Sequence, residues 1–441
     1  MSKVKPVAGK QYTIVSGDTL WDIASAVYGS GQKYQIIWDA NKSNLRSGDP
    51  NRIYPGERLW IPENPDRVED LRTTDEDGSR DVNPVEPLSI YLNGDKYNPT
   101  SATIIRTFDT CSDGWTATFR DDINDKEWTD YRGVFRPYGF TPAEVFIDNR
   151  STGKSFIYTV TLKGDSSSGE VSVEGFSPSI DIVDSVAEPP YEENNISLES
   201  WTRKLIKPFG LTYATSECDQ TIWNQVNSKK IKRVKIGREE KVFEHLSEKY
   251  RQKGFVLSNS LLANLSVRSA PKYTSVNQIV EEFVDDAEAG STPVWEFNST
   301  FKGRDRFRVT LATGKGRLKN FKDRYIDPSI PRNRRTIFNL SSSEESDMST
   351  AAKSRARKAI EDALTVTVPV RGWYSRDGKL YEPGQFVLYK SRRLFLEKGV
   401  VLMIRKVVYI QNADERKANL DLIPPAVYSQ DEEVDDPWSS A

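Results

Sequence analysis

The chain has 441 residues, of which 37% are hydrophobic and 29% are charged, and its formal net charge is −2. A chain of this length is too long for one hydrophobic core and predicts about three to five domains. The near-zero net charge argues against a strong overall field for specific nucleic-acid binding, and no segment approaches the roughly 18 apolar residues of a membrane anchor.

The cysteine content and the first ten residues indicate the cellular compartment in which the protein is assembled. Cys111 and Cys218 are too few for a disulfide framework, so they indicate free thiols in a reducing environment. Residues 1–10 lack the apolar segment of a secretion signal. We therefore expect assembly in a cytoplasm.

Residues 12–62 predict a strand, two helices and a second strand. Gly17 makes the turn after the first strand, and Asp18 stands where a helix N-cap is expected. The first helix has an apolar face at helical spacing, formed by Leu20, Ile23, Ala24 and Val27. The second helix has a shorter one, formed by Tyr34, Ile37 and Trp38. Trp21 lies off the first face and Trp60 alternates with inward residues, so both should be exposed.

Four motifs in this stretch together resemble a LysM domain. They are GDTLWDIA (residues 17–24), YG (28–29), AN (40–41) and IYPGERLWIP (53–62). The resemblance implies a βααβ fold with a groove, between two loops, that binds N-acetylglucosamine sugars of peptidoglycan or chitin. By position, it gives these candidate glycan-binding residues: Gly17, Asp18, Thr19, Leu20, Asn51, Arg52 and Ile53.

A structural role for the same residues is an alternative hypothesis. Asp18 and Thr19 are common at helix starts, and a glycine is common in a turn. A single copy also lacks the avidity that repeated weak modules provide. The module at residues 1–63 is therefore expected either to bind peptidoglycan or to clamp neighbouring proteins.

The remaining chain divides into β-rich and mixed segments. Residues 64–86 are charged and flanked by prolines, which is typical of a linker. Residues 87–190 alternate apolar and polar side chains and include a hairpin through GDSSSG (164–169), so they predict a first β-barrel. Residues 191–350 mix helical and strand periods and predict α+β domains, with a short helix near residues 276–283. Within them, residues 304–335 are basic and irregular, which indicates a solvated loop rather than a phosphate site.

The last third predicts a helix followed by a second β-barrel, in residues 351–430. The helix carries small residues, among them Ala352, Ala356 and Ala363, along one face. Apolar runs such as VVLMIRKVVYI (400–410) follow it. Residues 431–441 form an acidic tail.

The order of these parts over residues 87–428 is similar to that of baseplate hub proteins from contractile phage tails of the phage Mu type. The segments that carry the resemblance are GREEKVFEHLSEKYRQKGFVL (237–257), the helix at 351–363, VTVPVRGW (366–373), YEPGQFVLY (381–389), VVLMIRKVVY (400–409) and LDLIPPAVY (420–428). The fold class expected is therefore α+β multidomain, with a LysM module, two tube-like β-barrels and intervening α+β domains.

The hub resemblance also implies partners and a location. A homotrimer would present six similar barrels and join the sixfold tail tube to the threefold spike. The implied partners are the tail tube, central spike and baseplate wedge proteins, with the tape measure protein as a further candidate. The implied location is the virion.

Catalytic constellations are hard to find in this sequence. Its one histidine, His245, lies on an amphipathic helix, which favours a structural role over a zinc site or a triad. The acidic residues occur as doublets or in loops, and no phosphate-loop motif or paired CxxC occurs. We expect a protein without enzymatic activity, cofactor or metal. A LysM-targeted peptidoglycan hydrolase and a LysM wall-binding scaffold are the alternatives.

Overall fold

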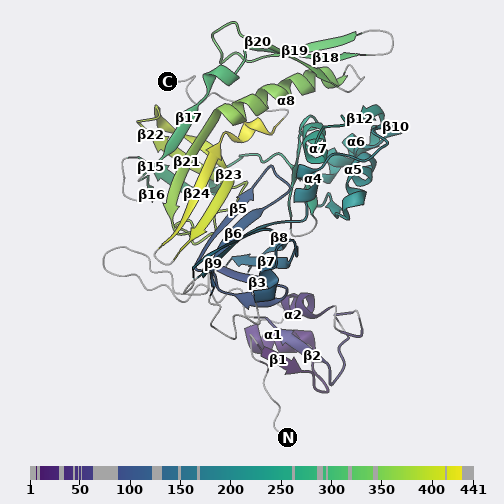
Figure 1. Cartoon of the computed structure of the whole chain (residues 1–441), viewed down its shortest axis with the longest axis vertical. Helices are drawn as coiled ribbons and strands as arrows, with labels where there is room; N and C mark the ends of the chain where they lie inside the picture. The colour runs from purple at the N-terminus through teal and green to yellow at the C-terminus, as the bar shows by residue number, and fades with distance from the viewer. Residues whose placement is uncertain are drawn as a thin grey trace. The chain divides into compact units, whose positions relative to one another are not determined.

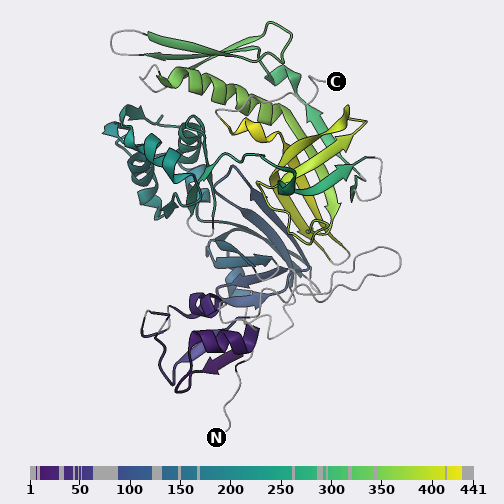
Figure 2. The ribbon, with the colours of Figure 1, turned by 180° about the vertical axis from the view of Figure 1, so that it is seen from behind.

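The computed structural model describes most of the chain, and the expected linker and acidic tail lie outside the described residues. The described ranges are 6, 10–28, 34–42, 45–47, 49–50, 52–62, 88–121, 132–147, 150–165, 169–260, 264–285, 292–294, 296–315, 320–340, 346–412 and 415–429. The chain forms two compact units, residues 1–85 and 86–441, which are described separately (Figures 1 and 2). The fold is mixed α+β and rich in strands.

The N-terminal unit has the expected strand–helix–helix–strand order. Its elements are β1 (Lys10–Thr13), α1 (Leu20–Tyr28), α2 (Tyr34–Asn41) and β2 (Arg58–Ile61). β1 and β2 pair antiparallel with Tyr12 opposite Leu59, and both helices pack their predicted apolar faces into one core. Trp21 and Trp60 are exposed, as predicted.

The first β unit is an antiparallel sheet. Its strands are β3 (Leu88–Leu92), β4 (Asp95–Tyr97), β5 (Ser101–Thr107), β6 (Gly114–Asp121), β7 (Pro142–Ile147), β8 (Arg150–Gly164) and β9 (Gly169–Phe176). Their order in the sheet is β4-β3-β7-β8-β9-β6-β5. β8 and β9 form the predicted hairpin, with Gly164 opposite Gly169.

The second β unit takes strands from two separate parts of the chain. Its strands are β15 (Ile279–Val284), β16 (Thr292–Pro293), β17 (Asn298–Phe301), β21 (Leu364–Arg371), β22 (Phe386–Ser391), β23 (Leu396–Gln411) and β24 (Arg416–Ile423). Their order is β16-β15-β22-β23-β24-β21-β17. The unit thus begins well before the predicted range 351–430. The helix expected near residues 276–283 is wrong beyond Gln278, where the chain enters β15.

The two β units have the same strand order. When the strands of each unit are numbered along the chain, both read 2-1-5-6-7-4-3. They differ in how the first strand of each unit pairs with its neighbours. β3 is antiparallel to β4 and β7, whereas β15 is parallel to β16 and β22.

The units are not the two separate closed barrels that the sequence predicted. β5 pairs antiparallel with β23, so both units belong to one 14-stranded sheet and share one hydrophobic core (Figure 1). In the part of the chain that the structure describes, no ladder joins β4 to β5 or β16 to β17, so neither unit is closed.

A helical domain separates the two β units in sequence. Its helices are α4 (Ile180–Asp184), α5 (Leu198–Ile206), α6 (Gln220–Ser228) and α7 (Val242–Arg251). Two small sheets accompany them, formed by β10 (Glu192–Ile196) with β12 (Ile231–Lys235), and by β11 (Tyr213–Ala214), β14 (Leu265–Ser269) and β13 (Phe255–Ser258). His245 is buried in its core and accepts a hydrogen bond from Trp201 Nε1 at 3.1 Å, which agrees with the predicted structural role.

A three-stranded sheet packs on α8 (Ser346–Ala363). It consists of β18 (Val309–Lys315), β19 (Asn320–Ile326) and β20 (Arg335–Leu340). Ala351 and Ala352 of α8 are buried against Ala312 of this sheet, so the small helix residues allow the close packing that the sequence predicted. The described residues also form five short 3-10 helices, at Arg132–Phe135, Lys207–Phe209, Val276–Gln278, Gly303–Asp305 and Pro425–Val427.

A cluster of buried charges, called here the junction cluster, lies where α7, α8, β23 and the segment after β5 meet. Arg405 contacts the Asp109 carboxylate at 3.2 Å and the Glu361 carboxylate at 2.9 Å, and Arg251 contacts the same two at 3.4 and 2.5 Å. Burial alone would raise the pKa of Asp109, but the Arg405 charge, the hydrogen bond with Glu361 and the Arg251 charge hold it below its usual range. Burial and the Asp109 charge raise the pKa of Glu361, although the charges of Arg251 and Arg405 act against this.

Candidate functional site: a groove on the N-terminal module

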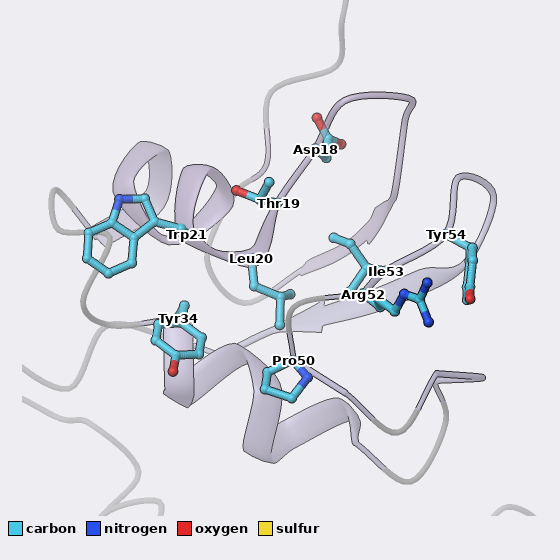
Figure 3. A pocket seen from close by; sticks show the side chains of 9 residues that line it. All are labelled: Asp18, Thr19, Leu20, Trp21, Tyr34, Pro50, Arg52, Ile53 and Tyr54. Carbon is cyan, nitrogen blue, oxygen red and sulfur yellow. The ribbon is translucent and has the colours of Figure 1, made fainter.

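A groove of about 500 Å³ lies between the loop before α1 and the loop before β2 (Figure 3). It is lined by Asp18, Thr19, Leu20, Trp21, Tyr34, Pro50, Arg52, Ile53 and Tyr54. The groove therefore joins the two loops that the sequence predicted to form a glycan site.

Hydrogen bonds fix the first wall at the start of α1. Thr19 Oγ1 accepts from the Asp22 backbone N–H at 3.0 Å and donates to Asp22 Oδ2 at 2.7 Å, so Thr19 is the N-cap. The predicted cap, Asp18, is wrong by one position. Its carboxylate instead accepts from Val15 N at 2.9 Å and from the Tyr12 hydroxyl at 2.7 Å. Burial and this bond to Asp18 raise the pKa of Tyr12 to about 12, so Tyr12 keeps its proton and holds Asp18 in place.

The second wall is held by a carboxylate behind the loop. Glu57 accepts hydrogen bonds from the backbone N–H groups of Arg46 at 3.0 Å and of Tyr54 at 2.9 Å. These bonds lower the pKa of Glu57, so the carboxylate stays ionised and fixes the backbone next to Ile53. Gly56, at φ +92°, makes the turn before β2 and donates its N–H to Ile14 O at 2.8 Å.

A buried amide joins α2 to β2. Asn41 Nδ2 donates to Ile37 O and Trp60 O, and Asn41 Oδ1 accepts from Trp60 N, each at 2.7 Å. The AN motif thus has a structural reason, because Asn41 satisfies backbone groups of both elements.

Aromatic side chains extend the groove beyond the predicted loops. The rings of Trp21 and Tyr34 lie 6.2 Å apart at 37° and stand together at one end, while Tyr54 lies at the other (Figure 3). Trp21 is 51% exposed, and Leu20 is buried beneath the groove. An apolar floor with exposed aromatic faces and nearby polar groups can hold the flat, apolar face of a sugar ring.

The structure brings together five of the seven predicted glycan-binding residues. Asp18, Thr19, Leu20, Arg52 and Ile53 line the groove. Gly17 makes the turn behind it at φ +90° and does not line it, and Asn51 lies outside the described residues. The sequence did not indicate Tyr34, Pro50 or Tyr54. Tyr34 had been assigned to a helix core, although its partial exposure is ordinary for a tyrosine at a helix edge.

Two other features are absent from the described part of the chain. It contains no cluster of His, Cys, Asp and Glu that could hold a metal ion. Within the same ranges, no helix combines the length and apolarity needed to cross a membrane. Cys111 and Cys218 are free and buried, as expected, and burial raises the pKa of both thiols.

Residues 12–62 match the LysM domain family, so the chain carries a LysM domain at its N-terminal end. Two curated proteins share this part. The potassium binding protein Kbp of Escherichia coli O6:H1 is 50% identical over 56 residues, which are 13% of this chain and 36% of Kbp. The uncharacterized protein YqbP of Bacillus subtilis is 41% identical over 64 residues, 13% of this chain and 29% of YqbP. The chain thus spans only about a third of either relative.

The structure is also similar to solved phage tail proteins. The 43 kDa tail protein of prophage MuSo2 from Shewanella oneidensis has a TM-score of 0.63 and 18% identity, over 78% of this chain and 99% of that protein. The tail protein from Neisseria meningitidis MC58 has a TM-score of 0.62 and 17% identity, over 78% and 98%. Over about 78% of the chain, the fold is therefore similar to that of these tail proteins.

Proposed function

We propose that this chain is a non-enzymatic baseplate hub protein of a contractile phage tail or a related injection machine. In this proposal three copies form a ring that joins the sixfold tail tube to the threefold spike. The ring also meets the wedge proteins and the tape measure protein, assembles in the host cytoplasm and ends up in the virion. The likeness to nearly the full length of two tail proteins supports the proposal at the level of the fold.

The observation that carries the proposal is the repeated strand order of the two β units. A threefold ring can meet a sixfold tube only if each chain presents a similar surface twice. Both units have the order 2-1-5-6-7-4-3, and β5 and β23 join them edge to edge within one chain. Three copies would continue this pattern as six units, each with its own sheet wall.

The mass of the purified chain in solution tests the ring. Light scattering should give three times the mass of one chain, and electron microscopy should show threefold particles with six lobes. Residues 86–441 alone should behave in the same way, because the LysM domain lies in a separate compact unit. A chain that stays monomeric at high micromolar concentration would contradict the proposal.

The LysM domain is proposed to bind an N-acetylglucosamine-containing glycan of the host cell wall. The groove with its exposed Trp21 supports this role over clamping of a neighbouring baseplate protein. Pull-down with insoluble peptidoglycan should retain the full chain, and soluble chitin oligosaccharides should compete. If soluble chitin oligosaccharides do not reduce the retention, the result would favour the alternative in which the LysM domain clamps a neighbouring baseplate protein.

The hydrolase alternative is tested by a zymogram. A LysM-targeted hydrolase would clear a gel that contains cell-wall substrate, whereas the proposed hub protein should leave it opaque. A wall-binding scaffold would bind the wall but stay monomeric, so the mass measurement separates it from the hub.

A further inference from the structure

The two β units can be aligned residue by residue because each has a bulge at the same place. In β8 the ladder to β9 shifts between Ile157 and Thr159. In β23 the ladder to β24 shifts between Ile404 and Lys406. Counting from the bulges, residues 159–164 of β8 correspond to residues 406–411 of β23.

The ladders carry this alignment across each sheet to its last strand. In the first unit the residues that stand opposite one another, from β8 to β5, are Thr159, Glu174, Thr116 and Thr103. In the second unit the corresponding residues, from β23 to β17, are Lys406, Asp421, Thr367 and Asn298. β17 (Asn298–Phe301) therefore corresponds to residues 103–106 of β5.

The corresponding halves of β23 and β8 have different surroundings. Beyond its bulge, β23 gains a second neighbour, β5, with Tyr409 opposite Ile104, and Tyr409 is 0% exposed. In the described ladders, the matching stretch of β8 pairs with β9 and with no strand on its other edge. Leu162, which corresponds to Tyr409, is 49% exposed. β8 thus shows an apolar edge where β23 is covered.

The partner strand shows the same contrast. β5 pairs with β6 on one side and with β23 on the other. β17 pairs with β21, and the described ladders give it no strand on the second side. Phe301, which corresponds to the largely covered Arg106, is 48% exposed.

The loops before β7 and β22 extend the correspondence. Ile157 N donates to Thr141 O at 3.0 Å, and Ile404 N donates to Gln385 O at 2.8 Å, so these loops align too. Tyr138 lies three residues before Thr141, and Glu382 lies three residues before Gln385. Tyr138 therefore corresponds to Glu382.

Glu382 contacts β5 within the chain, whereas the corresponding Tyr138 is almost fully exposed. Glu382 forms an ion pair with Arg106 of β5 at 3.3 Å. The residues that correspond to this pair are Tyr138 and Phe301. Tyr138 is 92% exposed at a positive φ of 60°, a conformation that is uncommon for an aromatic residue.

We propose that a second copy of this chain covers these residues, and that β17 of one copy pairs antiparallel with β8 of the next. The register is the one that β5 and β23 use within the chain, with Leu162 opposite Ser299 and Val160 opposite Phe301. Tyr138 then packs on Phe301, where Glu382 meets Arg106 inside the chain. The contact joins two different surfaces, so it closes a ring rather than a twofold dimer. This inference rests on the proposed ring and gives its between-chain interface.

A disulfide pair tests the register. Directly opposite residues of antiparallel strands have Cα atoms roughly 4.5–5.5 Å apart, which suits a disulfide. The variant Leu162→Cys/Ser299→Cys should therefore run as covalent oligomers up to the trimer on a non-reducing gel. The control Thr161→Cys/Ser299→Cys should not, because Thr161 faces the other side of the strand. The native cysteines are buried and should give little background.

The outcomes separate this inference from the proposed function. Suppose light scattering shows a trimer. If Leu162→Cys/Ser299→Cys then does not cross-link, or if the control Thr161→Cys/Ser299→Cys cross-links as well, the proposed register is wrong but the proposed ring is not contradicted. A monomer would overturn both. Chains that carry only Leu162→Cys, mixed with chains that carry only Ser299→Cys, should give cross-linked dimers. Such dimers would show that the disulfide forms between copies.

An exchange of charges tests the loop contact independently. Tyr138→Glu and Phe301→Arg should each weaken association by about tenfold or more, because buried aromatic contacts dominate such interfaces. The double variant should regain most of the loss, since it copies the pair Glu382–Arg106. If the loss of association in the double variant equals the sum of the losses in the two single variants, the proposed contact is contradicted. Circular dichroism should be unchanged in all three, because both residues are exposed in one chain.

Discussion

Replacement of Glu361 by Gln should loosen the helical domain from the β units. Glu361 is 0% exposed, and its carboxylate is contacted by Arg251 at 2.5 Å, Lys358 at 2.8 Å and Arg405 at 2.9 Å. Glutamine has nearly the same shape but no charge. The variant therefore keeps the packing and leaves two largely buried guanidinium groups with Asp109 as their remaining carboxylate in the junction cluster.

The expected cost is about 3–5 kcal/mol, the range for breaking one side of a buried ion pair. Arg251 and Arg405 cannot lose their protons to avoid the penalty. The loss should appear as local opening, because the cluster joins α7 and α8 to β23. Each 1.36 kcal/mol is a factor of ten, so hydrogen-exchange protection in these helices should fall by roughly two to four powers of ten.

Asp362→Asn is the matched control. Asp362 is the next residue on α8 and also contacts Lys358, at 3.1 Å, but its side chain is 53% exposed. An exposed pair at this spacing is worth about 0.3–0.5 kcal/mol, so protection should hardly change. Equal effects of the two variants, or a loss below tenfold for Glu361→Gln, would show that the junction cluster does not hold these elements together.

Four further predictions concern the LysM domain, the junction cluster and the linker. Trp21→Ala should lower retention on peptidoglycan several-fold, whereas Trp60→Ala, equally exposed but outside the groove, should not. Asn41→Ala should destabilise the LysM domain by about 1–3 kcal/mol, measured by urea unfolding, because it leaves the partly buried backbone N–H and C=O of Trp60 without the Asn41 side chain as a partner. The lowered pKa of Asp109 contributes stability above the usual pKa of about 3.8 that is lost as the pH falls below it, so Asp109→Asn should flatten the acid end of the pH–stability curve. Limited trypsin digestion should cut first within residues 64–86, and a first cut in residues 87–184 would contradict the predicted boundary.

The LysM domain could be predicted from sequence because its signals are local. The helix faces, the turn at Gly17 and the exposed Trp60 all follow from spacing within a few residues. The error at the N-cap was also local, since Asp18 and Thr19 are both good caps and the bond from Tyr12 decides between them. The aromatic end of the groove was missed because Tyr34 serves the core and the surface together.

The strands of the second β unit were harder to predict because their partners lie far away in the chain. Ile279, Val280 and Phe283 have a spacing that also fits a helix, and the sequence alone favoured one. Their pairing with β22, about a hundred residues later, settles the matter in favour of β15. Short strands are often decided by such non-local pairing, which local periodicity does not report.

The hub resemblance implied that the two β units are alike, but their strand order could not be read from sequence because corresponding positions carry different chemistry. Tyr409 and Leu162 stand at one such position, and the ion pair Arg106–Glu382 corresponds to Phe301 and Tyr138. The within-chain contact forms once, during folding, so it can include a charged pair, of which Arg106 is largely covered and the Glu382 side chain is 45% exposed. In the proposed ring, the corresponding residues between chains stay in water until assembly. Neutral aromatic side chains lose less solvation than charges when they become buried, which is a physical reason for the two contacts to differ.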